Sequence, residues 1–162
     1  MKRRICTFFV MLSTLGSNLI AENPAQNSPQ MSTQTDAATG NQTNDMAAWM
    51  IEASRAAQEY VDLLDNGRYA ESWTKGAQVF EHKISQAEWV GALNMARARL
   101  GSVKSRTLKD EKPAFDPKGL PKGPYMVVEY NTSFEFAPNS GELLTLMRES
   151  DGRWKVLTYQ VN

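Results

Sequence analysis

The sequence of 162 residues is poor in the side chains that most often hold metals or attack substrates. It contains one cysteine, Cys6, and one histidine, His82. A single cysteine excludes an intramolecular disulfide, and a single histidine lacks the i, i+4 partner of a helical metal site. We therefore predict no metal and no cofactor, and we interpret His82 as a structural or surface residue.

An excess of basic charge is absent as well, since 18 basic residues balance 18 acidic ones. Domains that bind nucleic acid usually carry a strongly basic patch or stripe. We therefore expect no nucleic-acid partner. Without the three basic residues at 2–4 the balance is 15 basic against 18 acidic residues, a mildly acidic surface that mainly favours solubility.

The first residues are typical of an export signal. Basic residues at 2–4 precede an uncharged and largely apolar run over 5–21, after which the sequence turns polar. This order predicts a secretory signal peptide over 1–21, cleaved after about Ala21, and an exported, periplasmic or secreted protein that has lost Cys6. A spanning helix needs about 20 predominantly apolar residues, so we expect no stable membrane insertion after cleavage. An uncleaved anchor is the alternative.

Residues 22–44 are mostly Asn, Gln, Ser, Thr, Ala and Pro, without a hydrophobic period. Such a segment cannot bury enough apolar surface to offset the entropy that it loses on ordering. We predict a disordered polar linker over 22–44. The remaining residues, 45–162, have the length of one domain.

The first part of this domain has the pattern of helices. Apolar residues recur at spacings of three and four from Met46 to Leu64, which predicts one buried helical stripe. Asn44 or Asp45 can cap the start of this helix, and Gly67 can supply the left-handed residue that ends it.

Two further helices are expected before the sequence changes period. A short one covers 68–74. The next begins at a capping box, in which the Ser85 hydroxyl and the Glu88 carboxylate each satisfy a free backbone amide of the first turn. Gly101 ends this helix.

After Gly101 the hydrophobic period becomes two, which is typical of strands. A loop over 113–124 contains four prolines and cannot lie in the centre of a sheet. We expect four strands, over 103–112, 125–136, 142–149 and 153–161. Helices followed by a strand meander predict an α+β fold, with N-terminal helices packed on one face of a curved antiparallel four-stranded sheet.

Several segments, in this order, resemble a bacterial exported family known as domain of unknown function 4019. They are Leu64–Trp73, Ser85–Leu93, Arg99–Val103, Tyr125–Phe134 and Asp151–Val156. The resemblance covers roughly residues 48–161 and departs at Thr158, where we would expect glycine. It implies a nuclear transport factor 2-like, or cystatin-like, cone in which a bent sheet wraps the helices, often around a pocket. The family brings no established catalytic residues, so we predict none.

Six side chains are candidates for lining such a pocket. They are Trp73, Trp89, Tyr130, Thr132, Phe134 and Arg148. The aromatic ones either pack the core or form a pocket for an apolar ligand. The polar ones, Tyr130, Thr132 and Arg148, share strand faces with apolar residues and need partners if they are buried. They therefore form either a satisfied network, which we favour, or a binding site.

Three arginines, Arg97, Arg99 and Arg106, cluster near the corner between the third helix and the first strand. Cations near a helix C-terminus complement the helix dipole, so a solvated basic end is the simpler interpretation. A site for an anion is the alternative.

We expect a non-enzymatic binding module for a small apolar ligand or an envelope protein. The alternative is an isomerase- or hydratase-like enzyme that acts on a small hydrophobic substrate in the cone pocket, with acid–base groups from Tyr130, Arg148 or His82. Fold analogy alone supports that alternative. A homodimer is also possible if the outer face of the sheet, with Tyr125 and Val127, pairs two copies.

Overall fold

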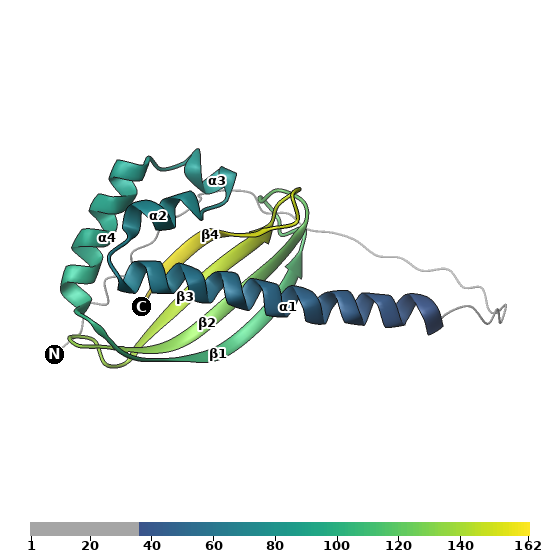
Figure 1. Cartoon of the computed structure of the whole chain (residues 1–162), viewed down its shortest axis with the longest axis horizontal. Coiled ribbons are helices and arrows are strands. Elements are labelled where there is room, and N and C mark those ends of the chain that lie inside the picture. Colours follow the sequence, from purple (N-terminus) through teal and green to yellow (C-terminus); the bar gives the residue numbers. More distant parts are fainter. Residues whose placement is uncertain (1–35) are drawn as a thin grey trace, which may run out of the picture.

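The computed structural model describes the backbone of residues 36–162 and the side chains from residue 45 onward. The predicted signal peptide and the first part of the predicted linker lie outside the described residues. Within them, helices precede strands (Figure 1). The elements are α1 (Asp36–Asp65), α2 (Tyr69–Thr74), α3 (Gln78–Glu81), α4 (Gln86–Leu100), β1 (Val103–Phe115), β2 (Pro124–Phe134), β3 (Ser140–Arg148) and β4 (Trp154–Val161).

Helix α1 is longer than the sequence pattern indicates. It begins at Asp36 rather than at Asn44 or Asp45, so residues 36–44 of the predicted linker are helical. A helix that has already formed gains one hydrogen bond for each residue added, and therefore needs no buried stripe over its whole length. Its first turns extend beyond the sheet (Figure 1). No helix within residues 36–162 is long and apolar enough to cross a membrane.

The end of α1 follows the prediction. Gly67 adopts a φ of 69°, a left-handed conformation that glycine reaches without strain. Its amide donates to the carbonyl of Leu64 over 3.2 Å, and the amide of Arg68 donates to the carbonyl of Leu63 over 2.8 Å. These two bonds form a Schellman motif, which satisfies carbonyls that the helix leaves free.

The capping box of α4 is also confirmed. The Ser85 hydroxyl accepts a bond from the Glu88 amide over 3.3 Å, and the Glu88 carboxylate accepts one from the Ser85 amide over 3.0 Å. Gly101 ends the helix with a φ of 73°. The single helical turn α3 was not expected from the sequence.

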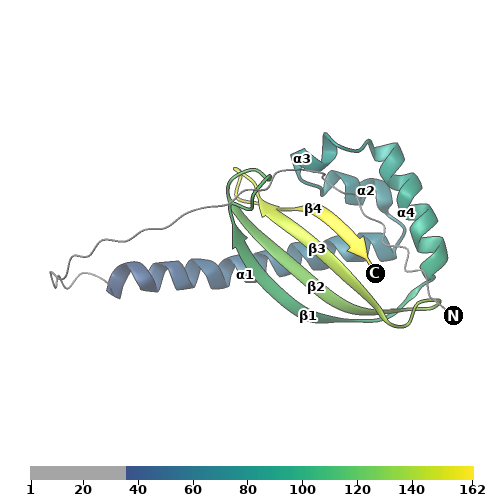
Figure 2. The same ribbon diagram turned by 180° about the vertical axis from the view of Figure 1, so that it is seen from behind.

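The four strands form one antiparallel sheet in the order β1-β2-β3-β4. The helices lie on one face of this curved sheet, and Figure 2 shows no described helix over the other face. The core fills the space between α1 and the two central strands. Its fully buried members include Ala53, Ala57, Val61, Met126, Val128, Leu144 and Leu146. The predicted α+β class and its helix-on-sheet architecture are confirmed.

Six strand boundaries differ from the prediction by one to three residues, and two of these differences change how residues are placed. Strand β1 continues to Phe115 and contains Pro113, which pairs with Met126 instead of beginning a loop. Proline is tolerated there because β1 is an edge strand. Strand β2 ends at Phe134, and Phe136 lies beyond it with 67% of its surface exposed. The predicted extension of this strand to Phe136 was therefore wrong.

The pairing contains irregularities that change which residues face the helices. In β1 the register shifts between Val103 and Ser105 and again between Leu108 and Asp110. In β4 the partners step from Val156 to Thr158, which leaves Leu157 as the extra residue of a bulge. A bulge reverses the alternation of side chains between the two faces beyond it.

The free edge of β4 is partly covered by the segment between α2 and α3. Gly76 forms a parallel bridge with Val156. The amide of Ala77 donates to the carbonyl of Val156 over 2.8 Å, and the amide of Val156 donates to the carbonyl of Lys75 over 3.3 Å. This bridge fixes the turn after α2 against the start of β4.

Candidate functional site

Charged and hydrogen-bonding side chains meet between the helices and the sheet, where Arg97, Thr132 and Glu142 are buried and the Asp65 side chain is 22% exposed. We call this group the polar cluster, and its members are Asp65, Arg97, Arg106, Thr132, Glu142 and Tyr159. They come from the end of α1, from α4 and from all four strands. Segments distant in the sequence thus supply one interior site.

Glu142 lies at the centre of the polar cluster, with a fully buried side chain. Its carboxylate accepts bonds from Arg106 Nε over 2.6 Å, from the Thr132 hydroxyl over 2.5 Å and from the Tyr159 hydroxyl over 2.6 Å. A buried carboxylate is tolerable when its oxygens are fully hydrogen-bonded and paired with a cation. Glu142 meets both conditions without any ligand.

Asp65 supplies the second carboxylate and binds both arginines. Arg106 reaches it over 2.6 Å and Arg97 over 3.1 Å. The guanidinium of Arg97 also lies 5.2 Å from the ring centroid of Phe134, within cation–π range. Two cations thus face two anions, and the polar cluster carries no net charge.

This arrangement corrects the interpretation of the arginines. Arg97 and Arg106 do not form a solvated basic end, because their side chains are only 8% and 9% exposed. Nor is an external anion needed there, because Asp65 and Glu142 take that place. Only Arg99 of the three is exposed.

Burial and pairing shift the pKa values in and around the polar cluster. Burial opposes the charged form of Arg106, but its bonds to Asp65 and Glu142 raise its pKa overall. Burial raises the pKa of Tyr159, with the charge of Glu142 adding to the effect. Burial likewise raises the pKa of Tyr130 to about 12. Both tyrosines are therefore neutral at physiological pH, and Tyr159 acts as a hydrogen-bond donor.

Two bulges direct members of the polar cluster inward. Strict alternation from Val103 would turn Arg106 to the outer face, but the first irregularity of β1 places Arg106 opposite the buried Thr132. In β4 the bulge at Leu157 places Tyr159 opposite the buried Leu144. Period-two sequence patterns do not reveal such reversals.

The predicted site residues are not brought together as one pocket wall. Trp89, Tyr130 and Phe134 are each at most 4% exposed. The indole N–H of Trp89 donates to the Ser72 hydroxyl over 2.9 Å, and that of Trp73 donates to the Ile84 carbonyl over 2.9 Å. These bonds hold the aromatic rings between the helices.

The three polar candidates separate into two places. Thr132 binds Glu142 in the polar cluster, and the ring of Tyr130 lies 5.9 Å from the guanidinium of Arg106. Arg148 lies at the other end of β3, 5.5 Å from the ring centroid of Trp49. Sequence reasoning overlooked Glu142, although its spacing with Leu144 on β3 places both on one face.

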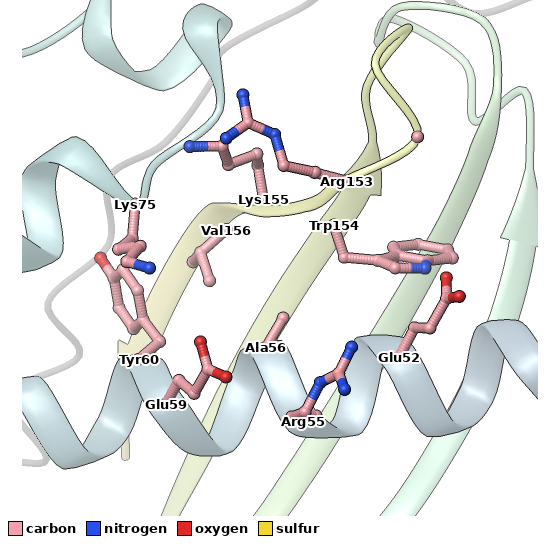
Figure 3. A pocket seen from close by; sticks show the side chains of 11 residues that line it. Glu52, Arg55, Ala56, Glu59, Tyr60, Lys75, Arg153, Trp154, Lys155 and Val156 are labelled. Atoms are coloured by element: carbon pink, nitrogen blue, oxygen red, sulfur yellow. The ribbon is translucent and has the colours of Figure 1, made fainter.

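The larger of two described pockets lies on the surface, between α1 and the start of β4 (Figure 3). We call it the α1–β4 groove. Its volume is about 400 Å³. It is lined by Glu52, Arg55, Ala56, Glu59, Tyr60, Lys75, Gly152, Arg153, Trp154, Lys155 and Val156. None of the six predicted site residues lines it.

A second pocket, of about 330 Å³, lies at the corner between α1, α4 and β1. Asp65 and Arg97 of the polar cluster form part of its wall, beside Asn94 and Ser102. Their charges are already paired with each other, so this pocket offers a ligand mainly neutral polar groups. Within residues 36–162, no group of three or more His, Cys, Asp or Glu side chains could hold a metal ion.

Comparison with known proteins identifies the family. The family described as "Protein of unknown function (DUF4019)" matches residues 56–159. The chain belongs to this family. The resemblance seen in the sequence is thereby confirmed, and the family description assigns no activity. No curated protein matches the chain.

Solved structures support the fold. Matches include a protein from Catenulispora acidiphila, which is 17% identical, with a TM-score of 0.50. The alignment covers 73% of this chain and 93% of that protein. At this identity the likeness shows the fold alone. The nuclear transport factor 2-like or cystatin-like class stays a prediction.

Proposed function

We propose that the protein is an exported binding module without catalytic activity, and that its ligand binds in the α1–β4 groove. The observation that carries this proposal is the groove itself. Its volume falls in the range of small-molecule sites, and it combines an apolar floor with charged side chains at its rim. The export signal in the sequence supports a role outside the cytoplasm.

The interior offers less to a ligand than the groove does. Ala57, Val128 and Leu144 have no exposed surface, and these residues belong to one packed core. Most hydrogen-bonding groups of the polar cluster bind one another, and Arg97 Nη2, which has no hydrogen-bond partner among the described residues, lies within ion-pair distance of Asp65 and Glu142. A ligand inside the cone would have to displace these contacts, whereas a ligand in the groove would displace only solvent.

The three acid–base candidates of the enzymatic alternative do not lie at one place. Tyr130 pairs with Glu142 on β3, and Arg148 lies six residues farther along that strand. At about 3.3 Å for each residue, the two positions are about 20 Å apart. His82 is exposed, at the C-terminus of α3. These three residues are therefore poor candidates for one acid–base site.

One of the two residues predicted for a dimer surface, Tyr125, is buried within its own chain. Tyr125 is 1% exposed, and its hydroxyl donates to the carbonyl of Pro121 in the β1–β2 loop over 2.7 Å. The loop of its own chain thus engages this ring, which is not available to a second copy. Val127 remains partly exposed on that face.

Filling the groove tests the proposal. Ala56 faces the groove from α1 (Figure 3). Ala56→Met would occupy the floor with a residue that favours helices. The full-length chain, expressed in its own cells and purified under native conditions, should carry a reproducible extra mass in native mass spectrometry, and Ala56→Met should lose it.

The matched control is Ala48→Met, which makes the same change on an exposed position of the same helix. It should retain the ligand. The proposal fails if the purified protein carries no ligand or crosslinked partner, or if Ala56→Met and Ala48→Met retain the same one equally.

A further inference from the structure

We propose that the α1–β4 groove takes an anionic amphiphile, a small molecule with an apolar body and one carboxylate or phosphate group. This inference rests on the proposed function, because it names the ligand class for the same groove. Three features support it, namely the excess of cations at the rim, the absence of described ion-pair partners for three of them, and the apolar floor.

Positive charge exceeds negative charge along the groove. Its cations are Arg55, Lys75, Arg153 and Lys155, and its anions are Glu52 and Glu59. Glu52 lies 4.0 Å from Arg148, which is outside the groove lining, so part of its charge is already balanced. Clefts lined by an excess of one sign attract ligands of the opposite sign.

Three of these cations, Arg55, Lys75 and Lys155, have no described carboxylate within ion-pair distance. Among the side chains described from residue 45 onward, Lys75 and Lys155 form no salt bridge, whereas Arg153 pairs with Asp151 over 2.6 Å. Lys155 donates only to the carbonyl of Thr74, over 3.3 Å. An anionic group at this rim would therefore not compete with a protein carboxylate.

The fold holds these lysines at the mouth of the groove. The bridge between Gly76 and Val156 joins the backbone next to Lys75 to the backbone next to Lys155. Figure 3 shows Lys75, Lys155 and Arg153 along one side of the groove, across from the acidic residues of α1. The bridge fixes the backbone from which both lysine side chains extend, so the two cations stay close to the groove.

The floor between the charged sides is apolar. Ala56 of α1 faces Val156 of β4, and Trp154 and Tyr60 flank them (Figure 3). A bare inorganic anion would leave this surface unused, whereas an alkyl or aromatic body would cover it. Burial of apolar surface contributes about 25 cal/mol per Å² to binding before the costs of association. The combination therefore favours an amphiphile over a simple ion.

Defined probes test this ligand class on the full-length chain. Decanoate, decyl phosphate and decyltrimethylammonium carry straight alkyl bodies of nine or ten carbons and differ in the head group. Each is titrated below its micelle concentration, by calorimetry and by NMR. Decanoate and decyl phosphate should bind more tightly than decyltrimethylammonium, and their shifts should include the Trp154 indole N–H, which has no hydrogen-bond partner among the described residues.

Charge reversal localises the head group. Lys75→Glu and Lys155→Glu should each weaken the binding of both anionic probes by about tenfold, since each variant replaces an attraction by a repulsion. Lys104→Glu makes the same charge change on β1, the opposite edge strand, and should leave affinity within about twofold. Unchanged thermal unfolding of the variants shows that they still fold.

The outcomes separate the ligand sources and the two proposals. Tighter binding of decyl phosphate indicates a phosphate headgroup, and tighter binding of decanoate indicates a free carboxylate. Equal binding of the cationic probe, or no effect of either reversal, overturns the inference. If neither anionic probe binds while a native ligand is lost in Ala56→Met, the anionic class is wrong and the groove function stands.

Discussion

Tyr159 donates its hydroxyl to the buried carboxylate of Glu142 over 2.6 Å, from a position that a regular strand would turn to the outer face. The bulge at Leu157 makes this contact possible, because it shifts the alternation of β4 by one residue. A hydrogen bond at the centre of the domain therefore depends on a bulge in the middle of the last strand, β4.

Removing that hydroxyl should destabilise the fold. Tyr159→Phe keeps the ring but leaves Glu142 with one bond fewer in a buried site. An unsatisfied buried polar group costs about 1–3 kcal/mol, and we expect a loss of this size in the free energy of unfolding measured in urea. Tyr69→Phe, on a half-buried tyrosine outside the polar cluster, is the control. Equal losses in the two variants would contradict the assigned role of the contact.

Neutralising Glu142 should cost more. Glu142→Gln leaves Arg97 and Arg106 with Asp65 as their only partner in the polar cluster, so the buried charges no longer balance. Breaking a buried ion pair by removing one partner typically costs about 3–5 kcal/mol. Glu129→Gln on the outer face, where the carboxylate pairs with Lys109, should cost less than about 1 kcal/mol. Thermal and urea unfolding of both variants measure the difference, and a Glu142→Gln protein as stable as Glu129→Gln would refute it.

The first turn of α4 offers a smaller and more local test. Ser85→Ala removes the hydroxyl that accepts from the Glu88 amide. Loss of such a cap lowers stability by about 1 kcal/mol. Ser105→Ala, on the exposed surface of β1, should change the free energy of unfolding by less than half of that. Urea unfolding distinguishes the two, and indistinguishable midpoints would show that the capping box adds little.

Stability should fall at alkaline pH. Burial raises the pKa of Tyr130 to about 12, and burial also raises those of Tyr60 and Tyr159. An unfolded tyrosine loses its proton near pH 10, so above that pH the folded state binds more protons than the unfolded state. The free energy of unfolding should therefore be constant between pH 7 and about pH 9 and decrease above pH 10, by up to about 1.4 kcal/mol per pH unit for each tyrosine.

Urea unfolding between pH 7 and pH 11 measures this dependence. Tyr130→Phe should flatten the curve above pH 10, because it removes one of the groups that titrate. A free energy of unfolding that stays level to pH 11 would show that these tyrosines do not resist ionisation in the folded state.

The helices could be predicted from sequence because their signals are local. The capping box at Ser85 and the left-handed Gly67 both act through neighbouring backbone groups, and the structure has both. The upstream extension of α1 to Asp36 has no such signal, because helix propagation there does not require a buried face.

The polar cluster and the groove could not be predicted in the same way. Arg106 and Tyr159 face inward only because of bulges, and period-two patterns assume regular strands. The two-residue spacing between Glu142 and Leu144 does predict that both side chains face inward. A charged residue is usually exposed, however, and this general tendency favours the surface for Glu142. The groove joins α1 to the start of β4, so no local motif marks it.

The irregularities of the two edge strands, β1 and β4, also affect the tendency of the protein to aggregate at high concentration. A straight edge strand presents a row of free donors and acceptors that can template fibril growth. Here β1 is interrupted by two register shifts and by Pro113, and β4 is partly covered at Val156 by the turn after α2. The bulge that turns Tyr159 inward also bends the second edge. The bulges that turn Arg106 and Tyr159 into the interior thus also protect the domain against edge-to-edge aggregation.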